Sequence, residues 1–363
     1  MTTARPPVPT IGIVANPVSA RDIRRIVANA GNLQITDRVN IVLRVLASAA
    51  ACGVERALLM PDRGGIRALL ERHFRRHHES DTGYPEIEYL PMEPNSTVDD
   101  TFTATRLLER AGVAAIVVLG GDGTHRAVVR ELVDSGSRIP IAGLSTGTNN
   151  AFPEMREPTI TGMAVGLYAS GRIDAAQALT ANKLVEVQIH DPRHGDRRDL
   201  AIVDAVVTHD RSVGARALWK TSSLDAVYLA FADPQAIGLS SIGALLQPVG
   251  RRDPGGLAVQ LAPDERHALL TLRAPIAPGM VRPLAIASWQ RMVAGEALAV
   301  AASAGTIALD GERELGFEPG QSVHMTLREN AFFTVDVARC MTAAAEQGLL
   351  RSAPRPPSPP PTH

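Results

Sequence analysis

Short apolar runs alternate with amphipathic stretches over the first 150 residues of the chain. The apolar runs, which we expect to be strands, are 11–15, 56–60, 86–90, 114–119 and 139–144. Between them, apolar residues recur at the i, i+3, i+4, i+7 spacing of a helix, and they predict helices over about 36–52, 66–77, 99–111 and 125–133. Apolar strands that alternate with helices are typical of a parallel sheet covered on both faces. The pattern therefore predicts an α/β, doubly wound parallel sheet.

The pattern changes after about residue 155. Short β-type runs separated by Pro and Gly occur at 183–189, 200–208, 257–261 and 269–272. We expect helices within 222–249, a closing strand over 332–337 and a helix over 338–347. These features predict an α/β domain over 1–155 and a β-rich domain over 156–329. The proline-rich tail over 352–363 is predicted to be disordered.

The charged residues exclude several classes of function. The net charge is -1, so the chain has no overall basic field for nucleic acid or for an anionic membrane. The basic residues are 35 Arg and only 2 Lys, Lys183 and Lys220, both of which we expect at the surface. No Gly-Lys-Ser/Thr string occurs, which excludes a P-loop, and no HRD or DFG string occurs, which excludes a protein kinase. The scarcity of lysine also argues against Schiff-base chemistry.

The remaining composition indicates a cytoplasmic protein. Cys52 and Cys340 are the only cysteines, so we expect neither a disulfide framework nor a CxxC metal site. Residues 1–10 do not resemble a signal peptide, and no apolar run is long enough to predict a membrane-spanning helix. No Gly-x-Ser-x-Gly or Gly-x-Gly-x-x-Gly string is present, which disfavours a serine hydrolase and a hydride-transfer dinucleotide site.

The strand predicted at 114–119 runs directly into Gly120-Gly-Asp-Gly-Thr124 and then into a helix. Glycine permits positive φ angles and lets a ligand approach the backbone closely. The start of the next helix favours a phosphate group. A carboxylate beside a phosphate serves a cation or a proton, so Asp122 is a candidate for holding Mg²⁺ or for accepting a proton from an attacking hydroxyl. The structural alternative is a tight turn in which Asp122 caps the helix.

Two further strand ends carry small polar residues. The first strand ends in Asn16-Pro-Val-Ser19 and the fifth in Ser145-Thr-Gly-Thr-Asn-Asn150. In a doubly wound sheet these loops lie at the same edge as residues 120–124, where ligands bind. Hydroxyl groups and backbone N–H groups at this edge are able to surround a polyphosphate without a lysine. The alternative for the asparagines is turn and capping chemistry.

These three loops resemble the signature loops of the superfamily of NAD kinases, diacylglycerol kinases and sphingosine kinases. Leu309-Asp-Gly-Glu312 is similar to an Asp-Gly-Glu element of its lipid-kinase branch. Within the superfamily, the stretches around Asn16, around 119–128 and at 213–219 resemble the acetoin-catabolism protein X group, which is classed with NAD kinases.

The resemblance implies an N-terminal domain of the NAD kinase type and a C-terminal β-sandwich, with residues 330–350 returning to the first domain and the active site between the two. It implies that the γ-phosphate of ATP, or of another NTP, moves to an alcohol with Mg²⁺, most simply from ATP to NAD to give NADP. The implied catalytic residues are Asp122 and Glu312. The implied nucleotide-binding residues are Asn16, Ser19, Gly120, Gly121, Gly123, Thr124, Thr146, Gly147, Thr148, Asn149 and Asn150. The relatives also imply a homo-oligomer.

The chain departs from the lipid-kinase pattern at two places. His125-Arg126 stands where those kinases carry Asn-Glu, and Asn150 stands where they carry a carboxylate. These departures leave three hypotheses open. The first is a kinase of NAD, the second is a kinase of a small hydroxyketone, diol or lipid linked to acetoin catabolism, and the third is a nucleotide-binding regulatory protein without catalysis.

Overall fold

The computed structural model describes residues 8–16, 33–76, 83–146, 150–209, 223–311 and 313–351. Within these residues, a nine-stranded sheet has the order β3-β2-β1-β4-β5-β16-β6-β7, with β13 paired to β16. Its strands are β1 (Thr10–Val14), β2 (Arg56–Leu59), β3 (Glu86–Tyr89), β4 (Ala115–Gly120), β5 (Ile141–Ser145), β6 (Leu179–His190), β7 (Arg197–Ala201), β13 (Ala297–Ala299) and β16 (Ser322–Val335). Strands β1 to β5 are parallel, and β1 and β4, which lie side by side, mark the point where the strand order reverses.

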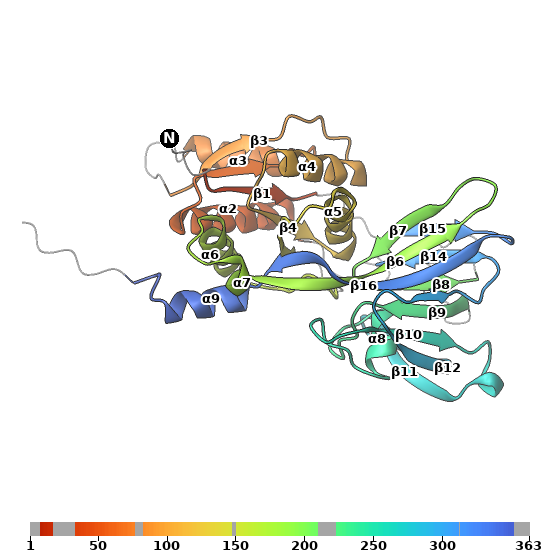
Figure 1. Cartoon of the computed structure of the whole chain (residues 1–363). Helices are drawn as coiled ribbons and strands as arrows, with labels where there is room; N and C mark the ends of the chain where they lie inside the picture. Colours follow the sequence, from red (N-terminus) through yellow and green to blue (C-terminus); the bar gives the residue numbers. More distant parts are fainter. Residues whose placement is uncertain are drawn as a thin grey trace, which may run out of the picture.

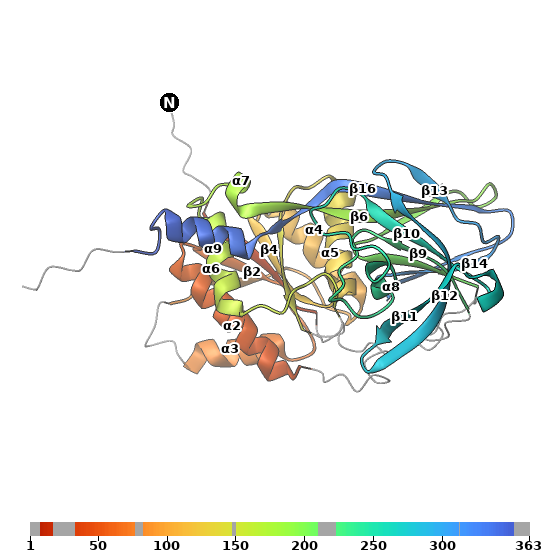
Figure 2. The same ribbon diagram turned by 90° about the horizontal axis from the view of Figure 1, so that it is seen from below.

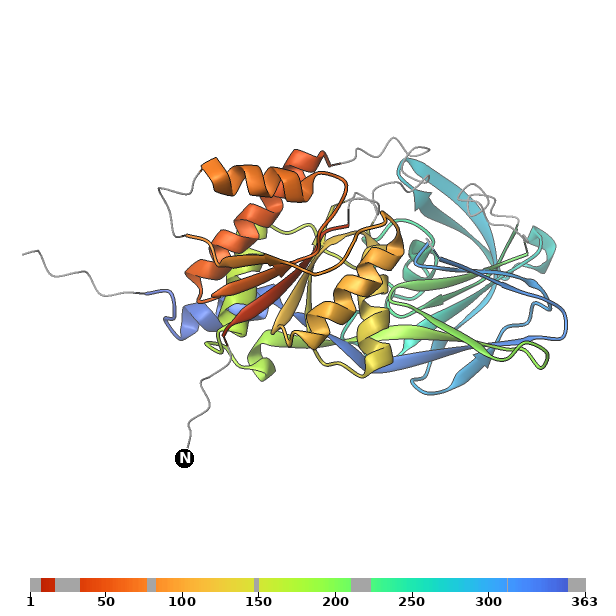
Figure 3. The same ribbon diagram turned by 90° about the horizontal axis from the view of Figure 1, so that it is seen from above.

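Helices cover both faces of the parallel strands. The helices are α2 (Ile35–Ala51), α3 (Ile66–Arg76), α4 (Val98–Arg110), α5 (Asp122–Ser135), α6 (Pro158–Ala169), α7 (Ala175–Ala178) and α9 (Val337–Glu346). Helices α2, α3, α6 and α9 share one core with the strand residues Ile11, Val117 and Leu144, and Figure 2 shows α9 and α6 beside α2. Helices α4 and α5 pack on the opposite face, against Val14 and Val118, as the view in Figure 3 shows. The predicted doubly wound arrangement is confirmed.

The parallel strands and the helices that cover them are called the first body below. Within the described residues, a second sheet of seven antiparallel strands lies beside it, in the order β11-β12-β10-β9-β8-β14-β15 (Figure 1). Its strands are β8 (Asp204–Thr208), β9 (Leu224–Leu229), β10 (Gly256–Leu261), β11 (Leu270–Ala277), β12 (Met280–Met292), β14 (Gly305–Leu309) and β15 (Arg313–Phe317). The short helices α8 (Ser240–Ala244) and η4 (Glu265–His267) accompany it. One face packs against β6, β7 and β16, so that Val187, Val207 and Ile307 share a core. The prediction of a C-terminal β-sandwich is therefore confirmed.

Strands β6 and β16 belong to both bodies. They pair over 11 register positions, from Ser322↔His190 to Val335↔Leu179, and Figure 1 shows them running from the helices into the sandwich. Strand β16 then pairs with β5 in parallel, and α9 returns to α6. One hydrophobic cluster consequently extends from Val14 in the first body to Phe317 in the second.

The structure differs from the sequence prediction at several elements. Helix α6 was not predicted because apolar residues occupy all of its faces, so no amphipathic period appears. The strand expected over 200–208 is divided into β7 and β8, since the backbone N–H groups of Ile202 and Val203 turn to bond Asp310. Residues 224–229, within a segment expected to be helical, form β9. The expected surface position of Lys183 is wrong: it is 6% exposed. Lys220 and the tail over 352–363 lie outside the described residues.

Candidate functional site

The candidate site begins where β4 ends and α5 starts. Gly121 is the N-cap of α5 and Asp122 is its first residue, as the expected turn requires. Gly121 does not make use of a positive φ, since its φ is -94°. Gly120 is needed for space, because a Cβ atom there would lie 2.5 Å from the Thr124 hydroxyl oxygen. The Thr124 side chain is therefore packed tightly against the end of the strand.

Asp122 connects this turn to the segment that follows β5. Its Oδ2 accepts a hydrogen bond from the Ala151 N–H at 2.9 Å, and its Oδ1 accepts one from the Phe152 N–H at 2.8 Å. The two loops also meet directly, since the Thr146 N–H donates to the Gly120 carbonyl at 3.3 Å. The carboxylate is thus held in one orientation at the edge of the sheet, half-buried beside the start of α5.

Two hydroxyl groups at this edge are buried and lack a hydrogen-bond partner in the described part of the chain. They are the Oγ1 atoms of Thr124 and Thr146, and their residues are 4% and 1% exposed. Buried polar groups in proteins are normally paired, so unpaired hydroxyls on two adjoining loops fit a ligand that supplies oxygen acceptors. Hydroxyls of this kind are able to donate to phosphate oxygens, and the assignment of Thr124 and Thr146 to a nucleotide stays a prediction.

Asn16 lies at the same edge, at the end of β1. Its Nδ2 donates to the Thr97 carbonyl at 2.9 Å and to the Thr101 hydroxyl at 3.1 Å. Arg38, which is buried in α2, donates to the Asn16 carbonyl. The Asn16 amide therefore fastens β1 to the start of α4. Asn150 likewise donates to the Ser145 hydroxyl at 2.8 Å, across the loop that follows β5. Ser19, Gly147, Thr148 and Asn149 lie outside the described residues.

The two residues that depart from the lipid-kinase pattern point into the interior. His125 is 0% exposed, and its Nδ1 lies 2.8 Å from the Gly121 carbonyl. Burial lowers the pKa of His125 to about 4, so the imidazole is neutral at pH 7. Arg126 forms a buried ion pair of 3.2 Å with Asp199 of β7. His125 and Arg126 thus hold α5 against the rest of the fold.

The turn between β14 and β15 approaches the site from the second body. Asp310 adopts a φ of 47° and accepts hydrogen bonds from the N–H groups of Ile202, Val203 and Asp204 at 2.9, 2.8 and 3.1 Å. Burial, and then the nearby carboxylate of Asp204, raise the pKa of Asp310 well above its usual range; Asp122 adds to this. Asp310 therefore lies within electrostatic reach of Asp122. Glu312, the predicted second acid, lies outside the described residues.

Arg251 contacts the segment that Asp122 holds, and no motif in the sequence singles it out. Its Nη2 donates to the Ala151 carbonyl at 2.5 Å. Its guanidinium stacks on the rings of Phe152 and Phe231, at 5.2 and 4.7 Å from their centroids. The segment at Ala151 is thus held by Asp122 on its N–H side and by Arg251 on its carbonyl side.

Lys183 fixes the loop that carries Arg251. Its Nζ donates to the carbonyls of Gly250, Asp253 and Gly255 at 3.0, 2.7 and 2.7 Å. Burial lowers the pKa of Lys183 to about 8. The ammonium has three N–H groups, and all three have acceptors here. Lys183 is therefore an internal support for loop 250–255.

No cluster of three or more His, Cys, Asp or Glu side chains suited to a metal ion occurs among the residues that the structure describes. In the same residues, no helix is long and apolar enough to cross a membrane.

Comparisons with known proteins show the family to which the chain belongs. Residues 11–173 match the ATP-NAD kinase N-terminal domain, and residues 183–330 match the acetoin catabolism protein X C-terminal domain. Acetoin catabolism protein X of Cupriavidus necator (strain H16) is 58% identical over 349 residues, which cover 96% of each chain.

One solved structure shows the same fold. The crystal structure of yeast NADH kinase complexed with NADH has 13% identity and a TM-score of 0.50, covering 96% of this chain and 90% of that one. A diacylglycerol kinase from Bacillus anthracis str. Sterne has 11% identity and a TM-score of 0.42, covering 90% of this chain and 96% of that one. With its NAD kinase fold and its match along nearly the full length of a curated relative, the chain belongs to the acetoin catabolism protein X family.

Proposed function

We propose that this chain is an ATP-dependent phosphotransferase that moves the γ-phosphate of ATP, or of another NTP, to an alcohol. The observation that carries the proposal is the placement of Asp122 at the start of α5, beside the unpaired hydroxyls of Thr124 and Thr146. The start of a helix favours phosphate through its N–H groups and its dipole. The site therefore combines groups that bind phosphate with one carboxylate of fixed orientation.

Two alternative roles in this reaction suit Asp122. Phosphoryl transfer depends mainly on positioning and on the stabilisation of negative charge. Mg²⁺, when bound, would neutralise charge on the transferring phosphate, and Asp122 is the residue that would hold it. Alternatively, Asp122 accepts the proton of the attacking alcohol. A carboxylate has about four lone-pair sites, so the two backbone hydrogen bonds of Asp122 do not by themselves prevent either role.

NAD is the acceptor that we propose first, with NADP as the product. The match of residues 11–173 to the ATP-NAD kinase domain supports it, as does the fold of yeast NADH kinase. The name of the 58%-identical relative favours a second acceptor, a small hydroxyketone or diol linked to acetoin catabolism. Glu312 is proposed as a second acid. Residues Asn16, Ser19, Gly120, Gly121, Gly123, Thr124 and 146–150 are proposed to surround the nucleotide.

A nucleotide-binding protein without catalysis is the competing function, and one observation favours it. Both oxygens of Asp122 accept backbone hydrogen bonds, and His125 and Arg126 have interior roles. In this function, Asp122 shapes the loop and the nucleotide acts as a regulatory ligand.

A turnover assay distinguishes the kinase from the nucleotide-binding protein without catalysis. The protein is incubated with ATP and Mg²⁺ and with NAD, acetoin or a panel of diols; NADP is measured with a coupled dehydrogenase, and ADP release is measured for every acceptor. Acceptor-dependent ADP release supports the kinase. Saturable ATP binding without release for any acceptor supports the regulatory function, and the absence of ATP binding contradicts both.

Asp122→Asn is the decisive variant. It keeps the shape of the side chain but removes its charge, so we expect turnover to fall by about 100-fold or more. Asp134→Asn, an exposed carboxylate near the end of the same helix, is the matched control and is expected to retain activity. An Asp122→Asn protein as active as the parent would contradict the catalytic assignment.

A further inference from the structure

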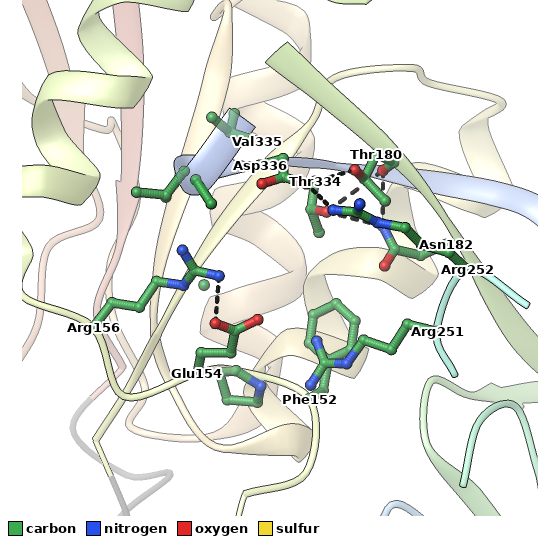
Figure 4. Close-up of a pocket in the computed structure, with 14 residues that line it drawn as sticks. Phe152, Glu154, Arg156, Thr180, Asn182, Arg251, Arg252, Thr334, Val335 and Asp336 are labelled. Atoms are coloured by element: carbon green, nitrogen blue, oxygen red, sulfur yellow. Dashed lines mark hydrogen bonds and ion pairs between the residues drawn. The ribbon is translucent and has the colours of Figure 1, made fainter. Parts of the chain in front are cut away.

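A cavity of about 180 Å³ is lined in part by Phe152, Pro153 and Glu154, which belong to the segment that follows β5. Figure 4 shows Arg156 and Glu154 on one side of it, and Arg251 and Arg252 on the other. Thr180, Asn182 and Thr334, from the strands that join the two bodies, also line it. The cavity is therefore formed by the first body, by the loop that Lys183 supports and by the shared strands.

The charges around the cavity do not balance. Arg156 pairs with Glu154, and Arg252 pairs with Asp336. Arg251 has no carboxylate within ion-pair distance in the described part of the chain; its guanidinium contacts the Ala151 carbonyl and two aromatic rings. Three guanidiniums thus line the cavity together with two carboxylates. The carboxylates that act on Arg251, those of Glu154, Asp122 and Asp233, do so from beyond ion-pair distance.

Two further groups affect the electrostatic potential of the cavity, namely the start of helix α9 and the carboxylate of Asp336. Val337 and Ala338, the first residues of the ten-residue helix α9, line the cavity, and the start of a helix carries partial positive charge. Asp336 is already engaged, because it accepts hydrogen bonds from the Thr180 hydroxyl and the Arg339 N–H in addition to its pairing with Arg252. The negative charge of Asp336 is therefore compensated by these partners.

We infer that this cavity binds a small oxyanion, namely the carboxylate or phosphate group of a small molecule, as the counter-ion of Arg251. Guanidinium groups are suited to both because their planar N–H forks match two oxygens at once. The site is separate from the loop at Asp122, although both contact Ala151: Asp122 through its N–H and Arg251 through its carbonyl. An anion that draws Arg251 away from the Ala151 carbonyl would remove one of the two contacts that hold this segment and would leave the contact with Asp122.

Direct binding measurements test the inference without reference to catalysis. Inorganic phosphate and pyruvate are titrated into the full-length protein by calorimetry, with and without saturating ATP. We expect saturable binding that persists in the presence of ATP. Binding of phosphate alone, or of pyruvate alone, identifies the group that the site accepts.

Arginine variants locate the binding. Arg156→Gln and Arg252→Gln lie at the rim, and each is expected to weaken binding by about tenfold through the loss of a charged donor; Arg251→Met is expected to abolish it. Arg282→Gln, an exposed arginine of β12, is the matched control. If Arg251→Met does not fold, as circular dichroism would show, the two rim variants decide the result.

Three results would overturn the inference. They are the absence of saturable binding, equal binding by the rim variants and the Arg282→Gln control, and loss of the anion signal when ATP is bound. The last result would place the anion in the loop at Asp122. None of them bears on the proposed kinase, which is tested separately by ADP release.

Discussion

At the scale of single residues, the hydrogen bonds explain positions that the sequence pattern marked as unusual. His125 departs from the lipid-kinase pattern, and the structure gives it an interior role: its Nδ1 contacts the Gly121 carbonyl, and its ring packs 5.9 Å from that of Phe152. Gly143 leaves room for it, since a Cβ atom there would lie 2.7 Å from the His125 Nε2. A neutral imidazole is thus part of the core beneath the site.

This burial makes the stability of the protein depend on pH. The unfolded chain protonates His125 near its ordinary pKa of 6.5, whereas the folded protein does so only near 4. The unfolded state therefore binds more protons between these values, and stability is lost as the pH falls from 6.5 to 4, by up to about 3 kcal/mol. Urea unfolding of the parent and of His125→Asn at several pH values measures the effect. A stability difference between the two proteins that does not change with pH would contradict it.

At the scale of elements, loop 250–255 shows how one buried cation organises a segment. Lys183 of β6 holds three carbonyls of this loop, and Arg251 extends from the loop to Ala151. Glu329 of β16 accepts the Gly255 N–H and adds a further support. The position of the segment beside Asp122 therefore depends on a contact in the second body.

Lys183→Met tests this support. The substitution leaves three carbonyls without their donor, and we expect a loss of about 3 kcal/mol in the free energy of unfolding. Arg291→Met is the matched control, because exposed Arg291 donates to the Pro254 carbonyl of the same loop; its expected cost is below about 1 kcal/mol. Chemical denaturation measures both values, and equal losses would show that Lys183 has no special role.

At the scale of the whole molecule, the two bodies share strands and a core. Strands β6 and β16 run through both, and one hydrophobic cluster contains residues of each. The buried Arg126–Asp199 ion pair joins α5 to β7. These contacts make the bodies mutually dependent for their stability.

We therefore expect a single unfolding transition. In differential scanning calorimetry, the calorimetric and van 't Hoff enthalpies should agree, as for a cooperative unit. Two separate transitions would show that the bodies unfold independently and would contradict the shared core.

The elements of the first body were readable from the sequence because buried parallel strands are almost wholly apolar, as Ala115–Gly120 is. The loop at Asp122 was readable because glycines cluster around one carboxylate. The structural roles of Asp310, Lys183 and Arg251 were not predicted, because they depend on backbone groups far away in the sequence, at Ile202, Gly250 and Ala151. The periodicity of a sequence does not show which distant residues form such hydrogen bonds.

The position of β16 has a consequence for synthesis of the protein. Strand β5 pairs with β4 on one side and with β16 on the other, and β16 ends at Val335, near the C-terminal end of the chain. The pairing with β16 lies at Thr334↔Ile141, so the β5 edge at Ile141 stays unpaired in a nascent chain until residue 334 has been translated. Open edges of this kind invite pairing with other chains. If translation stops before residue 322, the fragment that is released would be prone to aggregation and would not be a functional protein.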